Sequence, residues 1–449
     1  LSGPAAAKAL ARRGARVLVN DARAADALRS KTDALRADEF ADAYEFVLGD
    51  HPPALADRAD LFVISPGVPY DLPMLAAARS RDIPTIGELE LAFSLGRARV
   101  VAVTGTKGKS TTTTLIGAML DAQFGAEHVA VGGNIGVPLT EITPNLGSDD
   151  WLVAEVSSFQ LESIVTFRPN VAVALNISPD HIDRHGSLEA YVAAKQRVVE
   201  NQTADDLLVV NDDDAVAASF AKGVAARIAR FSLERPVSFG AFIEGGSIVF
   251  AERGRTSRVC PTDAVAAPGR HNVANALAAA TVACCVGVDF RHVESSLRAF
   301  HGLPHAYERV AEVDGVTYVD DSKATNLAAV KAAIETAIGS ARDVVLIMGG
   351  VDKGNRYEEL APTLRSSVAR VILLGPNVAR LTQAVDGVTS HAHAADMDEA
   401  VRMAAESAAD GDVVLMSPGH ASFDLYTNWK ERGHAFQRAV RALTPRGPS

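Results

Sequence analysis

The chain has 449 residues, of which 48% are hydrophobic and 22% charged, and its formal net charge is −11. The composition is typical of a soluble globular protein, and the length predicts about three domains at roughly 150 residues each. The negative charge argues against a nucleic-acid polymer as partner. Three cysteines without a Cys-x-x-Cys pair indicate a reducing, cytoplasmic compartment. We expect no membrane partner, because no apolar run reaches the ~20 residues that span a bilayer.

Residues 1–93 are predicted to form an α/β unit whose beginning is missing. An alanine-rich helix precedes Gly14 and a strand over residues 15–20, which ends at Asp21. An acidic residue after the second strand is typical of nucleotide-binding βαβ units. We therefore expect roughly 10–15 further residues upstream, enough for a ~5–6-residue strand and a turn. A strand over residues 61–64 runs into a Ser-Pro-Gly turn, which is either a ligand site or a plain connection.

The clearest functional signal is a glycine- and lysine-rich loop over residues 105–111. It follows an apolar β-branched run and precedes a predicted helix over residues 111–120. Glycines let successive backbone N–H groups surround phosphate oxygens, Lys109 reaches the outer phosphates, and Ser110 can ligate Mg²⁺. The loop is a shortened variant, because Val103 stands where the common motif has its first glycine. It predicts a nucleoside-triphosphate site, the alternative being a plain glycine-rich turn.

Polar groups lie at or just after the ends of three further predicted strands of the central region, over residues 129–137, 151–156 and 171–175. They include Asn134, Glu155, and a segment over residues 176–185 that contains His181. In a parallel sheet these groups gather at the edge that carries the phosphate loop. Glu155 and Ser110 offer the oxygen ligands that Mg²⁺ prefers. The simpler alternatives are a turn or helix cap for Glu155 and a surface position for His181.

Two predicted helices complete the central region. The helix over residues 188–201 carries Lys195, and from the residues alone a solvated surface lysine is the favoured interpretation. Pro268 and Gly269 open an alanine-rich helix with Asn272 and Asn275 at its start. These amides either cap the helix or hydrogen-bond an adenine edge.

Residues 300–449 predict another mostly parallel α/β sheet. Strands are expected over residues 316–319, 344–348, 371–374 and 413–416, separated by alanine-rich helices. Three of them end in polar or glycine-rich loops, over residues 320–326, 349–354 and 417–424. The expected fold is therefore α/β with three domains: a Rossmann-like unit over 1–93, a central P-loop ATPase-like unit over 94–299, and a Rossmann-like unit over 300–449.

Taken together, these motifs resemble the Mur ligases from residue 1 to about residue 440. The resemblance rests on the segments 105–111, 132–136, 155–162, 176–184, 321–326, 417–418 and 421–424. Segments 321–326 and 421–424 point to the branch that handles D-glutamate. The resemblance implies that ATP phosphorylates the carboxylate of UDP-N-acetylmuramoyl-L-alanine and that the amine of D-glutamate attacks the acyl phosphate. A tetrahedral intermediate then releases phosphate, leaving an amide bond in a peptidoglycan precursor.

The resemblance also implies roles for individual residues. The catalytic set is Lys109, Glu155, His181, Lys195 and Lys323, with one Mg²⁺ on Ser110 and Glu155 and a second on His181 and a CO₂-derived carbamate of Lys195. ATP would contact Gly105, Thr106, Lys107, Gly108, Lys109, Ser110, Thr111, Asn272, Asn275 and Asp321. D-Glutamate would contact His181, Thr325, Lys353, Ser422 and Trp429, and the UDP-substrate Leu1, Asp21, Arg23, Ser65, Gly67 and Asn134. We expect a monomer.

Three residues depart from the family pattern. Ala306 stands where the family usually has an arginine that reaches the adenine, so either Arg309 or the pair Asn272 and Asn275 would make that contact. Trp429 replaces a phenylalanine or tyrosine, and His420 replaces a small residue or cysteine.

The rival interpretations are another Mur-type ligase, a folylpolyglutamate synthase, a P-loop GTPase and a non-enzymatic nucleotide sensor. No Asn-Lys dipeptide occurs in the chain, although a GTPase needs an Asn-Lys-x-Asp motif to read its base.

Overall fold

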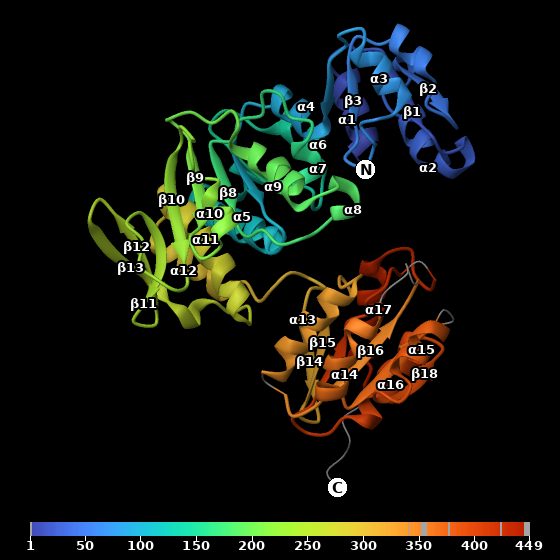
Figure 1. Ribbon diagram of the computed structural model, residues 1–449, viewed down its shortest axis with the longest axis vertical. Coiled ribbons are helices and arrows are strands. Elements are labelled where there is room, and N and C mark those ends of the chain that lie inside the picture. The colour runs from blue at the N-terminus through green and yellow to red at the C-terminus, as the bar shows by residue number, and fades with distance from the viewer. Residues whose placement is uncertain (1, 340, 352–356, 376–377, 423, 444–449) are drawn as a thin grey trace. The chain divides into compact units, whose positions relative to one another are not determined.

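The computed structural model describes residues 2–443, except for 340, 352–356, 376–377 and 423 (Figure 1). The chain forms two compact units that divide between Phe300 and His301. The boundary expected near residue 93 lies inside the first unit and stays a prediction. Among the described helices, none combines the length and apolar character needed to cross a bilayer.

The first unit begins with two small parallel strand pairs. Its elements are α1 (Ser2–Ala11), β1 (Val17–Asp21), α2 (Ala25–Arg36), β2 (Tyr44–Leu48), β3 (Phe62–Ile64), α3 (Pro73–Arg79) and β4 (Thr85–Gly87). β1 pairs with β2 and β3 with β4, both in parallel. The two strands predicted here are confirmed to within about two residues at each end. Helix α4 (Glu88–Leu95) then leads into the main sheet.

The main sheet of this unit has nine strands in the order β13-β12-β11-β10-β9-β8-β5-β7-β6. They are β5 (Arg99–Thr104), β6 (Val129–Gly133), β7 (Trp151–Glu155), β8 (Val171–Ala174), β9 (Leu207–Asn211), β10 (Arg227–Ser232), β11 (Gly240–Glu244), β12 (Ser247–Glu252) and β13 (Arg255–Pro261). All pairings are parallel except those of β12 with β11 and β13. The carboxyl ends of β6, β7, β5 and β8 therefore lie along one edge, as the sequence predicted.

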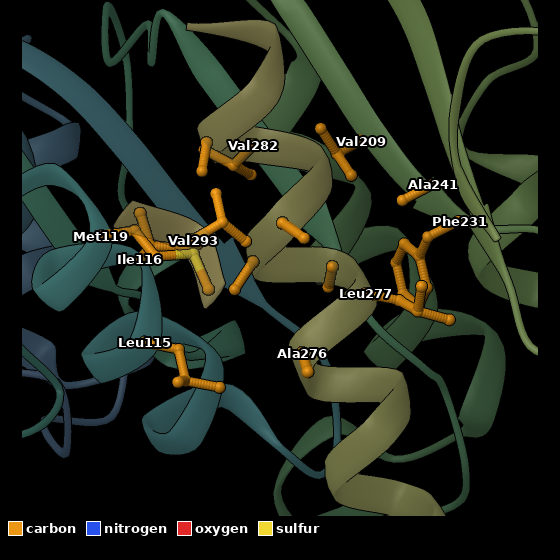
Figure 2. Close-up of a cluster of buried hydrophobic side chains, with 14 of the residues drawn as sticks. Leu115, Ile116, Met119, Val209, Phe231, Ala241, Ala276, Leu277, Val282 and Val293 are labelled. Atoms are coloured by element: carbon orange, nitrogen blue, oxygen red, sulfur yellow. The ribbon is translucent and has the colours of Figure 1, made fainter. Parts of the chain in front are cut away.

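The longer helices of this unit cover the two faces of the main sheet, and its short helices lie in the connections between strands. They are α5 (Lys109–Phe124), α6 (Leu139–Ile142), α7 (Ser158–Leu161), α8 (Ile182–His185), α9 (Leu188–Gln196), α10 (Ala215–Ser219), α11 (Arg270–Cys285) and α12 (Phe290–Ala299). Figure 2 shows α5 and α11 meeting over strand side chains such as Val209 and Phe231. The alanines of α11 let this helix approach both α5 and the sheet closely, which fixes the start of α11 near the phosphate loop.

The second unit is built on a six-stranded sheet in the order β14-β15-β19-β16-β17-β18. Its strands are β14 (Glu308–Val313), β15 (Val316–Asp320), β16 (Val344–Gly349), β17 (Arg370–Leu374), β18 (Ser390–Ala394) and β19 (Val413–Met416). Among the described strands of this sheet, only β14 is antiparallel to its neighbour. The helices are α13 (Leu327–Ile338), α14 (Ala361–Ser367), α15 (Ala379–Val385), α16 (Met397–Ser407) and α17 (Trp429–Arg441). The four predicted strands are confirmed, and the expected α/β class holds throughout the described chain.

Candidate active site

The phosphate loop lies between β5 and α5 in the conformation that its glycines allow. Gly105 has φ +150° and Gly108 has φ +83°, both values that side-chain-bearing residues rarely adopt. A Cβ atom on Gly108 would lie 2.2 Å from Oδ1 of Asn275. The Nζ of Lys109 donates to the carbonyl oxygens of Gly105 and Thr106, each at 2.9 Å. The loop is therefore a tight turn in which a side chain at Gly108 would displace the Asn275 amide and strain the backbone.

The end of β8 holds this loop from the side. The N–H of Thr106 donates to the carbonyl of Asn176 at 2.8 Å, and the Asn176 amide exchanges two hydrogen bonds with the backbone of Lys107. The Thr106 hydroxyl lies within hydrogen-bonding distance of Ser178 and of the Tyr191 hydroxyl. These contacts fix the loop before any ligand binds. Sequence reasoning placed Asn176 at a strand end but did not predict its bonds to the loop.

Glu155, at the end of β7, is a buried carboxylate that joins two neighbouring elements. It is 2% exposed, accepts a hydrogen bond from the Ser110 hydroxyl at 2.6 Å, and accepts another from the Asn134 amide at 2.7 Å. A hydroxyl and a carboxylate oxygen this close form the hard-oxygen donor pair that Mg²⁺ prefers beside phosphates. The residues present therefore fit a magnesium ion.

Lys195, on α9, is buried against the phosphate loop. It is 2% exposed, its Nζ donates to the Gly105 carbonyl at 2.8 Å, and it lies 4.8 Å from the centre of the Tyr191 ring. Burial, with a smaller contribution from the charge of Lys109, lowers the pKa of Lys195 to about 7. The interpretation of Lys195 as a solvated surface lysine is therefore wrong.

His181 is not part of the hydrogen-bond network that surrounds the phosphate loop among the described residues. It is exposed, has φ +52°, and its ring lies 5.0 Å from that of Phe159. In the part of the chain that the structure describes, no hydrogen bond joins it to Lys195 or Glu155. The buried histidine nearby is His185, whose nitrogens lie 3.0 Å from the Ser158 hydroxyl and 3.1 Å from the Glu162 carboxylate. Its burial, which lowers its pKa, was not predicted from the sequence.

The two asparagines at the start of α11 lie beside the phosphate loop. Asn275 donates from its amide to Oδ1 of Asn272 at 3.2 Å, and Asn272 donates to the Pro268 carbonyl at 2.7 Å. Because Asn275 also reaches Gly108, the loop and α11 form one surface. The remaining loop residue, Thr111, lies in the first turn of α5.

The residues expected at the uridine end lie in the first part of the unit. Asp21 and Arg23 form an ion pair at 2.7 Å, and its hydrogen bond lowers the pKa of Asp21 to about 2. Ser65 and Gly67 follow β3, and Ser65 shares a cavity with Phe159 and Gln160 of α7. The turn after β3 and the residues of α7 thus line the same cavity. Leu1 lies outside the described residues.

The second unit holds the other predicted residues on loops after its strands. Asp321 is buried, accepts from the Ser417 hydroxyl at 2.7 Å and from the Tyr307 N–H at 3.1 Å, and burial raises its pKa to about 7. Ser422 is buried, whereas Lys323 is partly exposed and Thr325 exposed. Lys353 lies outside the described residues.

The residues that depart from the family pattern have defined partners. Arg309 pairs with Glu312 on its own strand. The centre of the Trp429 ring lies 5.8 Å from that of the His305 ring. A hydrogen bond of 2.6 Å joins Nε2 of His420 and the Tyr357 hydroxyl.

A buried hydrogen-bonded cluster that the sequence did not reveal lies beneath the Asp321 loop. His305 Nδ1 lies 2.7 Å from Asp320 Oδ2, and the amide nitrogen of Gln437 donates to Asp320 and to Glu308 at 3.0 Å each. Three of these side chains could also ligate a cation, since their ligand atoms lie within 4.8 Å of one another. The Gln437 amide, however, already supplies donors to both carboxylates, which accounts for the cluster as a hydrogen-bonded network.

The fold and the first unit's site define a nucleoside-triphosphate-binding α/β protein, with a phosphate loop beside a magnesium-type oxygen pair. Family models for the MurD-like N-terminal domain, the Mur ligase middle domain and the glutamate ligase domain match residues 1–87, 103–283 and 307–420. The chain belongs to the Mur ligase family.

Similar proteins span nearly the whole chain. UDP-N-acetylmuramoylalanine–D-glutamate ligases of Acidobacterium capsulatum and Pelotomaculum thermopropionicum are both 42% identical over 98% of this chain, covering 94% and 96% of their own lengths. Among solved structures, the UDP-N-acetylmuramate–alanine ligase MurC of Thermotoga maritima has a TM-score of 0.59 at 19% identity, covering 98% of this chain and 97% of its own. FolC of E. coli also has 0.59, at 18% identity, over 80% of this chain and 94% of its own. The two solved structures support the fold alone.

Proposed function

We propose that this chain is an ATP-dependent ligase that joins D-glutamate to UDP-N-acetylmuramoyl-L-alanine in peptidoglycan precursor synthesis. The observation that carries the proposal is the shortened phosphate loop against the Ser110–Glu155 pair, in a chain 42% identical to named ligases of this kind over nearly its full length. The enzyme would act as a cytoplasmic monomer with three domains, divided near residues 93 and 300.

The chemistry follows from the poor reactivity of a carboxylate toward an amine. Transfer of the γ-phosphoryl group makes an acyl phosphate and so gives the carboxyl carbon a leaving group. Both reacting groups are anionic, so fixed positive charge and hydrogen-bond donors must lower their repulsion. Lys109 would move from the loop carbonyls to the phosphates, and Ser110 with Glu155 would hold a magnesium ion. Bound there, the metal would screen phosphate charge.

The predicted carbamate of Lys195 has physical support from the burial of its amine. Only the neutral amine attacks CO₂, and a pKa of about 7 leaves a large neutral fraction at neutral pH. The product is an N-carboxylate and a released proton, and its oxygens could serve as metal ligands where an ammonium cannot. His181 would join it at a second Mg²⁺ after a movement of its exposed side chain.

Isotope labelling tests the carbamate directly. With ¹³C-bicarbonate we expect a carbamate carbon resonance in the wild type that is absent from Lys195→Arg and retained in Lys222→Arg, a control at an exposed lysine. A wild-type spectrum without that resonance would exclude the modification under those conditions.

The amino-acid end would lie on the loops of the second unit. Thr325, Lys353, Ser422 and Trp429, together with His181, are proposed to meet D-glutamate, with Asp321 near the nucleotide. The adenine contact would rest on Asn272 and Asn275, because Arg309 is engaged with Glu312. Lys323 is proposed to contact the transferring phosphoryl group.

At the uridine end, the proposed contacts are Leu1, Asp21, Arg23, Ser65 and Gly67, with Asn134 nearer the pyrophosphate. The cavity shared by Ser65 and α7 supports a substrate site beside the turn that follows β3.

Release of ADP with UDP-N-acetylmuramoyl-L-alanine tests the function. We expect turnover that requires D-glutamate and is not supported by L-glutamate, L-alanine or meso-diaminopimelate. Turnover with another amino acid would indicate a different Mur-type ligase. Turnover with a folate and L-glutamate would indicate a folylpolyglutamate synthase, and no turnover with any acceptor would indicate a nucleotide sensor.

A further inference from the structure

The first unit buries one histidine that the proposed reaction does not use. The side chain of His185, the last residue of α8, is 2% exposed. Its Nε2 lies 3.0 Å from the Ser158 hydroxyl, and its Nδ1 lies 3.1 Å from a carboxylate oxygen of Glu162. Ser158 is the first residue of α7 and Glu162 directly follows the last, so one imidazole contacts side chains at both ends of this helix.

Helix α7 has four residues, which is too short for a helix to be stable alone. The capping box of Ser157 and Gln160 fixes its backbone at the start, and Arg197 donates to the carbonyls of Leu161 and Glu162 at the end. These bonds hold the backbone of α7. The contacts of His185 are different, because they hold side chains.

Two side chains that line the cavity beside the turn after β3 contact this imidazole. The Phe159 ring stacks on it, with ring centres 5.3 Å apart and 15° between the planes, and Glu162 is its hydrogen-bond partner. Each oxygen of Glu162 has its own donor, since Oε1 faces His185 and Oε2 accepts from Arg184 at 3.1 Å. A carboxylate held in this way is less free to turn toward an anion in the cavity, where the two charges would repel each other.

The proton of His185 can be placed from the two partners of the ring. An ionised carboxylate only accepts hydrogen bonds, so Nδ1 carries the proton, and Nε2 of the neutral ring accepts from the Ser158 hydroxyl. Burial lowers the pKa of His185, with the carboxylate opposing this effect and Arg184, His181 and Lys195 adding to it. A protonated ring would also donate from Nδ1 to the carboxylate, so this contact is the same in both charge states.

The order serine, histidine, carboxylate is also found in serine hydrolases, where the histidine takes a proton from a nucleophilic hydroxyl. Ser158 is 2% exposed, which leaves its oxygen out of reach of a substrate carbonyl. The geometry therefore favours a role for His185 in holding α7 over nucleophilic catalysis by Ser158.

We propose that His185 is a positioning residue for the UDP-substrate, which fixes the Phe159 ring and keeps the Glu162 carboxylate engaged while the anionic substrate binds. This inference rests on the proposed function, because it takes the cavity as part of the site for UDP-N-acetylmuramoyl-L-alanine. His185 acts through these two side chains and touches no substrate.

Steady-state kinetics of the full chain tests the role with His185→Phe, which keeps an aromatic ring and removes both hydrogen bonds. We expect the KM for the UDP-substrate to rise at least ~tenfold, while the KM values for ATP and D-glutamate change less than about twofold. The KM for ATP should hold because Asn176 binds the phosphate loop independently of His185. His301→Phe, at an exposed histidine, is the matched control and should behave as wild type.

A second substitution tests whether the effect passes through Glu162. Adding Glu162→Gln to His185→Phe removes the charge that the first change sets free, so the KM for the UDP-substrate should return to within about threefold of wild type. His185→Asn keeps a donor near the position of Nδ1 and should show a smaller rise than His185→Phe. A residue that only stabilised the fold would show neither rescue.

Nitrogen NMR of the histidine-labelled protein gives a readout that needs no substrate. We expect a His185 signal with the proton on Nδ1 and a bare Nε2, assigned by its absence from His185→Phe. A neutral ring protonated on Nε2 would overturn the inference, and so would labelling of Ser158 by a fluorophosphonate, which would indicate a nucleophilic serine.

The outcomes separate the inference from the proposed function. A wild-type enzyme without ADP release that depends on the UDP-substrate and D-glutamate would refute the proposed function. An active wild type whose His185→Phe variant keeps the KM for the UDP-substrate, or raises all three KM values equally, would overturn the positioning role. If His185→Phe does not fold, the same comparison of KM values in His185→Asn decides the matter.

Discussion

Helix α4 carries two buried glutamates, Glu88 and Glu90. We expect the stability of the protein to respond differently when each is replaced by glutamine. Both Glu90 oxygens accept hydrogen bonds: Oε2 from the N–H groups of Val165 and Phe167 at 2.8 and 2.9 Å, and Oε1 from the N–H and hydroxyl of Thr166. The bonds to Glu88 from the N–H and hydroxyl of Thr140 both end on Oε1, at 2.8 Å each. Glu90 therefore accepts through both oxygens, whereas the two Thr140 bonds use one oxygen of Glu88, to which the backbone N–H of Leu139 makes a smaller contribution.

Replacing each glutamate by glutamine keeps the shape and removes one acceptor. In Glu90→Gln the amide oxygen can serve Val165 and Phe167 while the NH₂ turns toward Thr166, whose hydroxyl can accept from it. The buried N–H of Thr166 then faces a donor, and one unsatisfied group costs about 1–3 kcal/mol. That corresponds to a fall in Tm of roughly 2–12 °C at ~2–4 °C per kcal/mol. In Glu88→Gln the remaining oxygen accepts both Thr140 donors, so the change should stay within about 1 kcal/mol.

The pH dependence gives Glu88 a second signature. Burial outweighs its hydrogen-bond donors and raises the pKa of its carboxyl above 4.5. The folded state then holds this proton more tightly than the unfolded state, so the wild type loses stability as the pH rises from the unfolded pKa through the folded one. Glu88→Gln removes that loss and should gain on the wild type between pH 4 and neutrality.

Thermal unfolding followed by fluorescence between pH 4 and pH 8 tests both statements. Glu141→Gln is the matched control, because Glu141 lies on the neighbouring α6 with its side chain exposed, and we expect no change in Tm. Equal falls in Tm for Glu88→Gln and Glu90→Gln, or no fall for Glu90→Gln, would contradict the reasoning. Either result would show that the number of acceptor atoms in use does not determine how much each glutamate contributes to stability.

Two further predictions concern the nucleotide loop and the second unit. Gly108→Ala should weaken ATP binding by at least ~tenfold in calorimetry, because a Cβ atom there would collide with Asn275. The control is Gly223→Ala, at φ +74° with open space around it, which should bind ATP normally. Equal effects of the two substitutions on ATP affinity would refute the steric argument. Asp321→Asn should flatten the fall in Tm from pH 4 to pH 7, since a folded pKa of about 7 means that the wild type loses stability as its proton is released; an unchanged slope would contradict this.

Several apolar strands could be predicted from the sequence because they are buried on both faces, although the equally apolar β9 was not predicted. β7, β8 and β19 begin and end within about a residue of the expected positions, since each reads as a continuous apolar run. β14 and β18 were missed because both are edge strands with many partly exposed or exposed residues. Edge strands carry a weaker pattern, so their pairing is visible only in three dimensions.

Part of the candidate site follows from the same reasoning and part does not. The parallel sheet explains why Ser110 and Glu155 meet, since both follow strands that end at one edge. Lys195 lies four residues after Tyr191 on one face of α9, and both are buried, so helical periodicity carried a signal that the polar nature of lysine obscured. Asn176 gave no local signal, because its hydrogen-bond partner Lys107 lies 69 residues away in the sequence.

The antiparallel strand β13 at the end of the main sheet has a consequence for solubility. Its residues Arg255, Thr256, Ser257 and Arg258 are all exposed on an edge that offers unpaired backbone groups. Two arginines on such an edge disfavour the docking of a strand from another molecule, since like charges would meet at close range. Exchanging both for valine would leave the fold intact and turn this edge into a template for concentration-dependent aggregation.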